Sequence, residues 1–456
     1  MDLALRYRLI DLARGTNSVG LVNELRALQF ESPNEINLRT RAQLEDYFDE
    51  LRTSLPIFKD VAKFEDLPVI DKRFINEHKK ELVNPHYKGK LIRKKTGGST
   101  GEPLVYYTGK KAQSYLWAGI FLSWEAAGYK FGDRVAFFAG PSLFTKGSQQ
   151  SIYYHLLNVK VMSSFNMSPQ SMTENGTQLQ RGGFRLLYGY SDSIHRLARF
   201  YLDAGKKLAT SLRGIVCTAE TLTPVMRKDI EEAFGVPCYC QYGCHDAGVS
   251  AFECEHRNGF HLISTRSYAE VLPDGKLIST DLANRAMFLP RYDTGDIVRM
   301  SNRQCPCGRG FPLLDEVVGR HNDMVVDTLG TSVHSQFFTY MFREDERIRS
   351  YQVVFNESQL SVNLNIKQVS EKELSTLEDR IRKAIADVLV FPQLKIQFNK
   401  PFLIHANGKH RFVVRDANVG RSDDAYLQRS RCHLHKYVQC YITYKRSLWY
   451  CYHSPH

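Results

Sequence analysis

Residues 214–246 of the chain read GIVCTAETLTPVMRKDIEEAFGVPCYCQYGCHD. Gly214–Cys217 is a short apolar run typical of a buried strand. Thr223-Pro224 then provides an N-cap residue followed by proline at the first helical position, and Gly235 is placed to end the helix. Val236–Gln241 predicts the next strand. A strand, a helix and a second strand in this order indicate an α/β domain.

Polar residues follow both predicted strands. Thr218-Ala219-Glu220 comes after the first strand, and Tyr242–Asp246 comes after the second. Open α/β sheets bind their ligands beyond the carboxyl ends of the strands, so we expect these two segments to share one site. Cys244 and His245 are neighbours on an extended chain and should point to opposite sides, which argues against a Cys/His nucleophile pair. His245 is instead expected to border the substrate pocket.

The sequence before residue 214 has the same α/β character. Residues 1–60 predict helices that form a packing segment. Further helices are expected over Lys110–Ala127 and Gln149–Leu157, with a short apolar strand at Arg134–Gly140 between them. Together these patterns predict a large domain over 1–319, built from mixed sheets flanked by helices.

The sequence after residue 319 predicts a small α+β unit. A hairpin is expected from the strands Tyr351–Phe355 and Leu360–Ile366. A helix with a capping box should follow over Ser370–Val388, and a third strand over Leu394–Phe398. We expect a hinge over 320–323 and a small domain over 324–418. Residues 419–456 are aperiodic and rich in Tyr, Cys and His, so they are expected to lie outside the fold, with a metal-binding or partner-binding segment as the alternative.

The stretch 94–103, KKTGGSTGEP, has the composition of an anion-binding loop. Its glycines allow consecutive N–H groups to turn toward one anion, its hydroxyls add donors, and its lysines add positive charge. It is not a Walker A loop, because no Lys-Ser or Lys-Thr pair follows the last glycine. The stretch predicts a loop that wraps phosphate oxygens, although such clusters also occur in ordinary loops.

Further motifs follow along the chain in a fixed order. They are Phe64–Lys72, the Gly-rich stretch 94–103, Gln241–Asp246, Arg291–Asp296, Cys305–Arg309, Gly319–Asp323 and Asn407–Lys409. This set resembles the acyl-adenylate-forming superfamily of AMP-dependent synthetases and ligases. Within that superfamily it is most similar to the branch of phenylacetate-CoA ligase and CapK-like proteins. The resemblance covers about residues 40–416.

The resemblance implies an ATP-dependent, AMP-forming ligase that uses Mg²⁺, activates a small carboxylic acid as its acyl-adenylate and passes the acyl group to coenzyme A. It assigns the phosphates to Thr96, Gly97, Gly98, Ser99, Thr100 and Gly101. It assigns the adenine to Ala219, Glu220, Tyr242 and Gly243, and the ribose to Asp296 and Arg320. Asp246 matches the Mg²⁺-binding acidic residue, which in the family pattern is usually Glu. The carboxylate of Asp296 suits ribose because its two oxygens can accept from both hydroxyls.

Lys409 matches the mobile lysine of the family's small C-terminal domain. Its ammonium would bridge the substrate carboxylate and the α-phosphate as charge builds, and rotation of the domain would then withdraw it. Asn407-Gly408 before it suits a tight loop. A solvated lysine in an ordinary turn is the alternative interpretation.

Cys254, His261, Cys305 and Cys307 form a candidate Cys₃His zinc site. Their Gly-rich surroundings are irregular, so a metal could replace a missing core. Zinc near this position also belongs to the family resemblance. Four protein ligands leave no open position, which predicts a structural ion. Buried free thiols are the alternative.

Composition supports a folded protein of two or three domains, with 456 residues of which 43% are hydrophobic. Met1–Gly15 carries charged residues throughout, and no run of eighteen apolar residues occurs, so we expect a cytoplasmic location without a membrane span. Ten cysteines then favour reduced thiols or metal ligands. The charge of +12 is spread along the chain, which favours a basic surface for ATP and an acidic substrate over nucleic-acid binding.

Three other functions stay open at this point. The first is adenylyl or acyl transfer to an acceptor other than coenzyme A, in capsule or secondary-metabolite biosynthesis. The second is a non-catalytic, zinc-stapled protein that binds nucleotide or nucleic acid. The third is a degenerate paralogue that binds ATP but turns over poorly. The sequence specifies neither the acid nor the oligomeric state.

Overall fold

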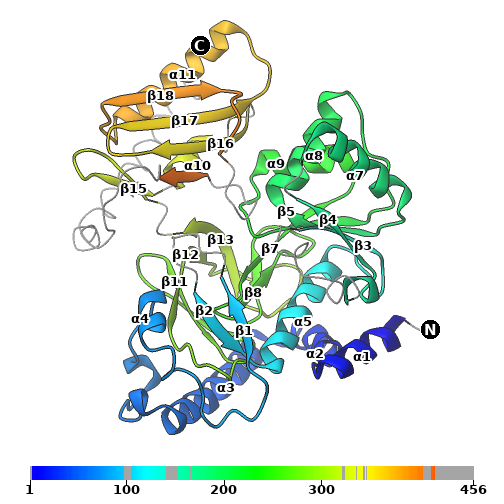
Figure 1. The fold of residues 1–456 in the computed structure, drawn as a ribbon, viewed down its shortest axis with the longest axis vertical. Helices are drawn as coiled ribbons and strands as arrows, with labels where there is room; N and C mark the ends of the chain where they lie inside the picture. Colours follow the sequence, from blue (N-terminus) through cyan, green and yellow to red (C-terminus); the bar gives the residue numbers. More distant parts are fainter. Residues whose placement is uncertain are drawn as a thin grey trace. The chain divides into compact units, whose positions relative to one another are not determined.

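The computed structural model describes residues 3–96, 104–139, 153–164, 167–320, 324–334, 336–342, 345, 347–403 and 412–415. These residues fall into two compact units, the first containing the described residues up to Arg320 together with Leu403, and the second containing those from Met324 to Phe402 together with 412–415 (Figure 1). No helix in the described ranges is long and apolar enough to cross a membrane.

Helices occupy most of the first sixty residues, as the sequence predicts. They are Leu3–Arg14 (α1), Ser18–Leu28 (α2) and Pro33–Ser54 (α3), followed by short turns at Pro56–Phe58 (η1) and Phe64–Asp66 (η2) and by Lys72–Glu77 (α4). Ser32 and Glu35 form a capping box that starts α3, and Asp71 caps α4 by accepting from the backbone of Phe74. A two-stranded hairpin comes next, with Ile92–Lys95 (β1) antiparallel to Val105–Thr108 (β2).

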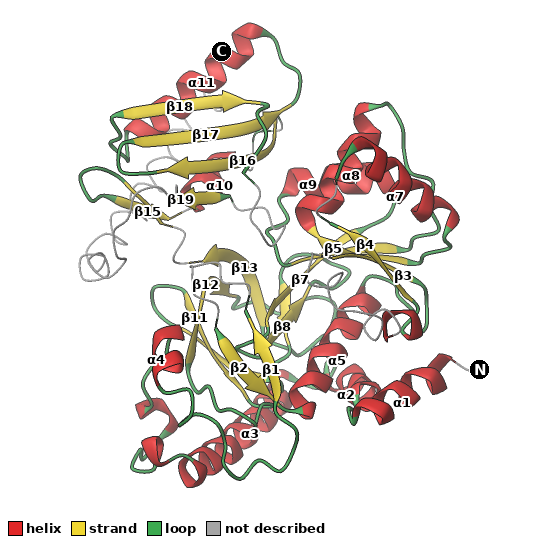
Figure 2. Ribbon diagram, viewed as in Figure 1, coloured by secondary structure: helices red, strands yellow, loops and turns green. Residues whose placement is uncertain are grey.

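An eleven-stranded mixed sheet forms the centre of the first unit (Figure 2). Its parallel part contains Val135–Ala139 (β3), Val159–Ser163 (β4), Leu186–Tyr190 (β5), Gly214–Thr218 (β6) and Cys238–Cys244 (β7). The helices of this part are Lys110–Ala126 (α5), Pro169–Arg181 (α7), Ser191–Asp203 (α8) and Pro224–Phe234 (α9). Of the expected helix Gln149–Leu157, residues 153–156 are helical and the part before residue 153 lies outside the described ranges.

The antiparallel part of the sheet continues from β7. It contains Val249–Phe252 (β8), Phe260–Leu262 (β9), Ser267–Val271 (β10), Lys276–Asp281 (β11), Tyr292–Met300 (β12) and Leu313–Arg320 (β13). The order across the whole sheet is β10-β11-β12-β13-β9-β8-β7-β6-β5-β3-β4. The expected large domain with mixed sheets flanked by helices is therefore present.

The β6–α9–β7 unit agrees with its sequence pattern in the order of its elements and the ends of α9, but β6 extends one residue further than expected, to Thr218, and β7 begins at Cys238. Thr223 caps α9 by accepting from the backbone N–H of Met226, and Gly235 ends the helix in the left-handed conformation at φ 68°. The second strand was expected over Val236–Gln241, but β7 runs on to Cys244. Antiparallel pairing with β8 extends the ladder to Cys244, so Tyr242 and Gly243 lie inside the strand rather than after it.

The second unit is a small α+β fold. Its elements are Met324–Val326 (β14), Ser332–His334 (β15), Gln336–Phe342 (α10), Ile348–Phe355 (β16), Gln359–Ile366 (β17), Glu371–Ala386 (α11), Gln393–Phe398 (β18) and Val413–Arg415 (β19). The hairpin, the third strand and the Ser370/Glu373 capping box agree with the sequence prediction. The sequence did not predict β19, a three-residue strand parallel to β16, because three residues are too few to show a period.

Candidate active site

The end of β6 forms one side of the candidate site. Ala219 turns the chain there in the left-handed region, at φ 67°. The Glu220 carboxylate accepts from the backbone N–H of Asp192 at 3.0 Å, and its backbone carbonyl accepts from Ser191 Oγ at 3.1 Å. Glu220 therefore supplies an acceptor to the first turn of α8, whose own N-cap side chain, Tyr190, makes no capping hydrogen bond.

Two tyrosine hydroxyls link the end of β7 to β12. Tyr242 Oη donates to Asp296 Oδ2 at 2.6 Å. In the opposite sense, Tyr292 Oη donates to Asp246 Oδ2 at 3.0 Å. In each motif the tyrosine precedes the carboxylate by four residues, and each tyrosine binds the carboxylate of the other motif. The structure thus brings Tyr242, Asp246 and Asp296 together, and adds Tyr292, which the sequence analysis did not single out.

These contacts require the sheet to curve strongly. Strands β12 and β7 are separated in the sheet order by β13, β9 and β8. In a flat sheet the four spacings of about 4.8 Å would put them about 19 Å apart, beyond the reach of a tyrosine and an aspartate. Curvature of the antiparallel part therefore brings two distant motifs to one place.

The Phe64–Lys72 motif holds the start of β12. Ile70 pairs with Tyr292 as an isolated parallel bridge, through Ile70 N to Arg291 O at 3.1 Å and Asp293 N to Ile70 O at 2.9 Å. The Arg291 guanidinium donates at 2.7 Å to the carbonyls of both Glu65 and Leu67 and forms a two-point ion pair with Glu270. The N-terminal motif thus fixes the residues that precede Asp296.

The base of the predicted phosphate loop lies in the β1–β2 hairpin. Thr96 closes it, because its backbone N–H donates to Leu104 O and its Oγ1 accepts from the Leu104 N–H, both at 2.9 Å. The predicted phosphate contacts Gly97, Gly98, Ser99, Thr100 and Gly101 lie outside the described residues. On β2, burial raises the pKa of Tyr106, and the nearby Asp246 charge adds to the shift. The hairpin therefore lies near the Asp246 end of β7.

The remaining predicted residues differ in what the structure says of them. Arg320 is the register partner of Asp296 across β12 and β13, so its backbone lies at the site, while its side chain is not described. Lys409 lies outside the described residues. Cys244 is buried and its thiol donates to Asp246 Oδ1 at 3.1 Å, whereas His245 is exposed, as expected for neighbours on opposite faces.

Two buried residues of opposite charge, Arg266 and Asp281, influence each other close to the same strand ends and were not predicted. Burial lowers the pKa of Arg266, while Asp281, Tyr106 and Cys244 oppose that shift. Burial likewise raises the pKa of Asp281, against the effect of Arg266. Arg266 also donates to Ser250 Oγ. Sequence alone gave no signal for this pair, because neither residue lies in a recognisable motif.

The four predicted zinc ligands come together at one point. The ligand atoms of Cys254, His261, Cys305 and Cys307 all lie within 4.8 Å of one another. Cys254 Sγ is 3.6 Å from Cys305 Sγ, and Cys307 Sγ is 3.3 Å from His261 Nε2. A tetrahedral zinc ion with about 2.3 Å bonds to sulfur would separate two thiolates by about 3.8 Å, so the donor set fits such an ion.

Burial and the neighbouring Arg309 shift the pKa values of the side chains in this cluster. Burial, with the charge of Arg309, lowers the pKa of His261 to about 4 and so favours the neutral imidazole that binds metals. Burial raises the pKa of Cys254 to about 12. Burial also opposes ionisation of Cys307, but the backbone N–H and guanidinium of Arg309 outweigh it and lower the pKa of that thiol.

The segment after Cys307 anchors the cluster to the end of α2. Arg309 donates to Gln29 Oε1 at 2.8 Å and pairs with Glu255 at 2.9 Å. The Gly310 N–H donates to the Gln29 carbonyl at 2.8 Å. A Cβ at Gly310 would lie 2.0 Å from the Glu31 carbonyl oxygen, so this close approach requires glycine.

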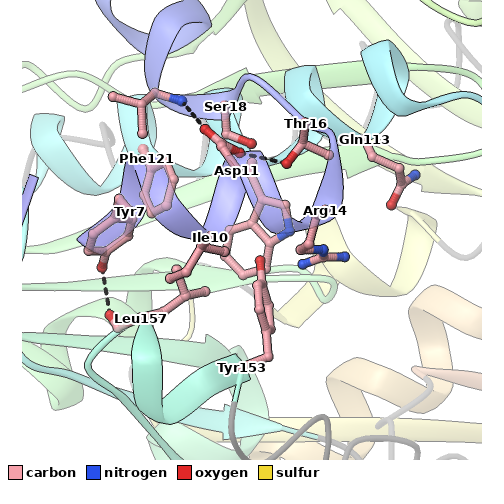
Figure 3. A pocket seen from close by; sticks show the side chains of 12 residues that line it. Tyr7, Ile10, Asp11, Arg14, Thr16, Ser18, Gln113, Phe121, Tyr153 and Leu157 are labelled. Atoms are coloured by element: carbon pink, nitrogen blue, oxygen red, sulfur yellow. Dashed lines mark hydrogen bonds between the residues drawn. The ribbon is translucent and has the colours of Figure 1, made fainter. Parts of the chain in front are cut away.

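A separate hollow lies among α1, α2, α5 and residues 153–157 (Figure 3). Its carboxylate, Asp11, already accepts from Thr16 Oγ1 at 2.6 Å and from the Val19 N–H at 2.8 Å. Arg14 stacks over the ring of Tyr153. None of the candidate active-site residues lines this hollow. It is a feature of the packing of α1 and α2 against α5 and residues 153–157.

No family model matches the sequence. Among curated proteins, the chain is 27% identical to protein CapK of Staphylococcus aureus over 58% of this chain and 60% of CapK. It is 30% identical to phenylacetate-coenzyme A ligase of Thermus thermophilus, over 38% of this chain and 44% of that protein. For the Escherichia coli phenylacetate-coenzyme A ligase the identity is 26%, with 60% and 66% covered. The chain therefore spans about half to two thirds of the length of these relatives.

Solved structures show the same fold. A 2-hydroxyisobutyryl-CoA ligase in the postadenylation state, in complex with R3-HIB-AMP, aligns with a TM-score of 0.63 at 16% identity, over 85% of this chain and 90% of that chain. The anthranilate CoA ligase AuaEII with anthranoyl-AMP aligns with a TM-score of 0.50 at 14% identity, over 71% and 66%. In fold the chain resembles these acyl-adenylate-binding ligases, which agrees with the resemblance that its motifs carry.

In sequence, the chain is similar to CapK and to phenylacetate-CoA ligases over part of its length.

Proposed function

We propose that the protein is an ATP-dependent, AMP-forming ligase that activates a small carboxylic acid as its acyl-adenylate and transfers the acyl group to coenzyme A. The observation that carries this proposal is the meeting of Asp246, Asp296 and Tyr242 at one place in a fold shared with adenylate-binding CoA ligases. Adenylation needs phosphate charge to be neutralised and two anions to be held against each other.

Each residue of the site has a role in that chemistry. Asp246 would hold Mg²⁺, which neutralises phosphate charge when bound, and Asp296 would accept from the ribose hydroxyls together with Arg320. Tyr242 presents an aromatic face that suits adenine. Ala219, Glu220 and Gly243 would line the same nucleotide, and the 96–101 loop would hold its outer phosphates. The basic balance of +12 suits an anionic substrate and ATP.

Lys409 would act on the reacting atoms. Its ammonium would stabilise the negative charge that builds as the substrate carboxylate attacks the α-phosphorus. The proposal includes rotation of the small domain about the 320–323 hinge, which would withdraw Lys409 before the thiol reacts. The family motif Asn407–Lys409 supports this role.

A structural zinc ion at the Cys₃His cluster is part of the proposal. The mutual distances of the four ligand atoms support it. The few apolar residues buried around the cluster also support it, because Cys254, Cys305 and Leu313 alone form that buried group. Four protein ligands would complete the coordination, so the ion would hold the fold and take no part in the reaction.

A second candidate is transfer of the acyl or adenylyl group to an acceptor other than coenzyme A. The similarity to CapK, at 27% identity over 58% of this chain, motivates this second candidate. The experiment that separates the two candidates is pyrophosphate release with MgATP across aryl, acyl and amino acids, with and without coenzyme A. Pyrophosphate release with thioester formation supports the ligase. Pyrophosphate release without a thioester favours the second candidate, and absence of nucleotide binding by calorimetry rejects both.

A further inference from the structure

The two motifs at the site hold each other through a reciprocal pair of hydrogen bonds. Tyr242 of the first motif donates to Asp296 of the second at 2.6 Å, and Tyr292 of the second donates to Asp246 of the first at 3.0 Å. We propose that Tyr292 and Tyr242 are positioning residues that form a reciprocal tyrosine–carboxylate brace, in which Tyr292 orients Asp246 toward the divalent cation and Tyr242 orients Asp296 toward the ribose. This rests on the proposed function of the site.

Geometry makes Tyr292 the rigid side of the brace. Its side chain is fully buried, at 0% exposure, within the apolar core next to the site. Its backbone pairs with Ile70, and the preceding Arg291 is fixed by two carbonyls and by Glu270. A hydroxyl held in this way can select one rotamer of a partly exposed carboxylate.

The chemistry of Asp246 explains why such a device is needed. Aspartate is one methylene shorter than glutamate, so the position of its oxygens depends directly on two torsions near the backbone. The Cys244 thiol donates to Oδ1 and the Tyr292 hydroxyl to Oδ2, which together define the plane of the carboxylate. Each carboxylate oxygen accepts more than one bond, so a cation can bind the same group.

The two tyrosines of the brace act on different carboxylates, and therefore on different ligands. Tyr292 acts on the cation-binding carboxylate and Tyr242 on the ribose-binding one, so removal of each hydroxyl should affect a different ligand. A purely structural role would lower stability without this division. The test uses Tyr292→Phe, Tyr242→Phe and the control Tyr7→Phe. In the control, a buried hydroxyl that donates to the Leu157 carbonyl is lost in the N-terminal helices, where no candidate site residue lies.

Two binding measurements show which ligand each tyrosine affects. The first is the Mg²⁺ concentration that gives half-maximal pyrophosphate exchange at saturating ATP, and the second is AMP affinity by calorimetry in magnesium-free buffer. We expect Tyr292→Phe to raise the Mg²⁺ requirement about tenfold with AMP affinity within about twofold of wild type, the scale of one hydrogen bond to a charged acceptor. Tyr242→Phe should weaken AMP about tenfold and leave the Mg²⁺ requirement unchanged. Tyr7→Phe should change only stability.

Crossed double-mutant cycles in chemical unfolding test the brace without any ligand. Tyr242→Phe should couple to Asp296→Ala, and Tyr292→Phe to Asp246→Ala, each changing the unfolding constant by about fivefold relative to additivity. The same-motif pairs, Tyr242 with Asp246 and Tyr292 with Asp296, should be additive. Equal shifts of both ligands in both tyrosine variants, or additive partner pairs, would overturn the brace. If the partner pairs couple in the unfolding cycles but the wild-type chain binds neither AMP nor ATP, the brace exists as a structural feature, and the proposed function and the positioning role are both rejected.

Discussion

The tyrosine brace and the Cys₃His cluster order polar side chains in the same unit by different means. The brace lies against a large apolar core, and the backbone pairing of Ile70 and Tyr292 supports it. Among the described residues, the buried apolar group at the cluster consists of Cys254, Cys305 and Leu313. A region with a core loses one contact when one side chain changes. A region held by a metal, as we propose for the cluster, would lose its order when any ligand changes.

The largest expected effect is loss of a metal ligand. Cys305→Ser and Cys307→Ser should each lower the free energy of unfolding by about 3–5 kcal/mol, since either change removes the same ion. The double variant should then be little worse than each single variant. Metal analysis of the wild type should give about one zinc per chain.

The control for this prediction is Cys240→Ala, which removes a buried thiol outside the cluster. Zinc content should not change in that variant. Additive losses in the double cysteine variant, or wild-type protein without zinc, would show that hydrogen bonds and packing, not a metal ion, hold the cluster together, as they do the brace.

A second prediction concerns Lys409, which would act by moving rather than by being held. Lys409→Ala should slow acyl-AMP formation by about 10²-fold, the scale of one lost electrostatic contact in a transition state. Coenzyme A should still react at the wild-type rate with pre-made acyl-AMP. Equal slowing of both half-reactions in rapid-quench measurements would assign Lys409 to folding or nucleotide binding instead.

The third prediction is a pH dependence specific to the cluster. Burial alone, without a metal ion, lowers the pKa of His261 to about 4, below its unfolded value of about 6.5, and a bound zinc ion would oppose protonation further, so protons bind the unfolded chain first. The contribution of His261 to stability is therefore complete above about pH 6.5 and declines as the pH falls toward 4, by about 3 kcal/mol from burial alone. Urea unfolding between pH 7.5 and 4.5 measures this decline, and His261→Gln should be less stable at neutral pH but flatter over the same range.

A smaller effect is expected at Arg291, which supports the brace from outside. Arg291→Lys cannot reproduce the fork that binds Glu65, Leu67 and Glu270, so it should cost about 1–2 kcal/mol and raise the Mg²⁺ requirement a few-fold. Arg285→Lys is the matched control, because Arg285 also bridges to an N-terminal helix through Asp46 and Glu50. That control should lose stability without a change in Mg²⁺ dependence.

The smallest effect is expected at the end of the chain. Deletion of residues 419–456 should leave the unfolding temperature and pyrophosphate release unchanged and should improve solubility, because this segment shows no periodic pattern that could join a core. Loss of activity, or a melting point several degrees lower, would mean that the segment is part of the fold.

Local chemistry decided which features the sequence could predict. Thr223-Pro224 and Gly235 mark the ends of α9 because caps act within one turn, and the Ser370/Glu373 box marks α11 for the same reason. The end of β7 was misplaced because pairing with β8, not local composition, sets it. The short strand β19 was missed for a similar reason, since it is defined by its neighbour β16.

The candidate site likewise contains residues that local sequence could predict and one that it could not. The family resemblance assigned Asp246 and Asp296, and residue type and spacing predicted the four candidate zinc ligands, whose ligand atoms the structure brings within 4.8 Å of one another. The role of Tyr292 was missed because its contact with Asp246 depends on curvature of a sheet across four strand spacings. One signal was present: a tyrosine lies four residues before the carboxylate in both motifs, as Tyr242 before Asp246 and as Tyr292 before Asp296.

The pairing of Ile70 with Tyr292 also has a consequence for biosynthesis. Arg291 reaches Glu65 across 226 residues of sequence and Leu67 across 224. Contacts of such separation carry a large loop-closure cost and form late in folding. During translation the Phe64–Lys72 segment emerges long before its partner strand exists, so the ribosome must add more than 200 residues before it can pair. The nascent chain can thus build the parallel β3–β7 region first, and the carboxylates of Asp246 and Asp296 take their places only after β12 has been made.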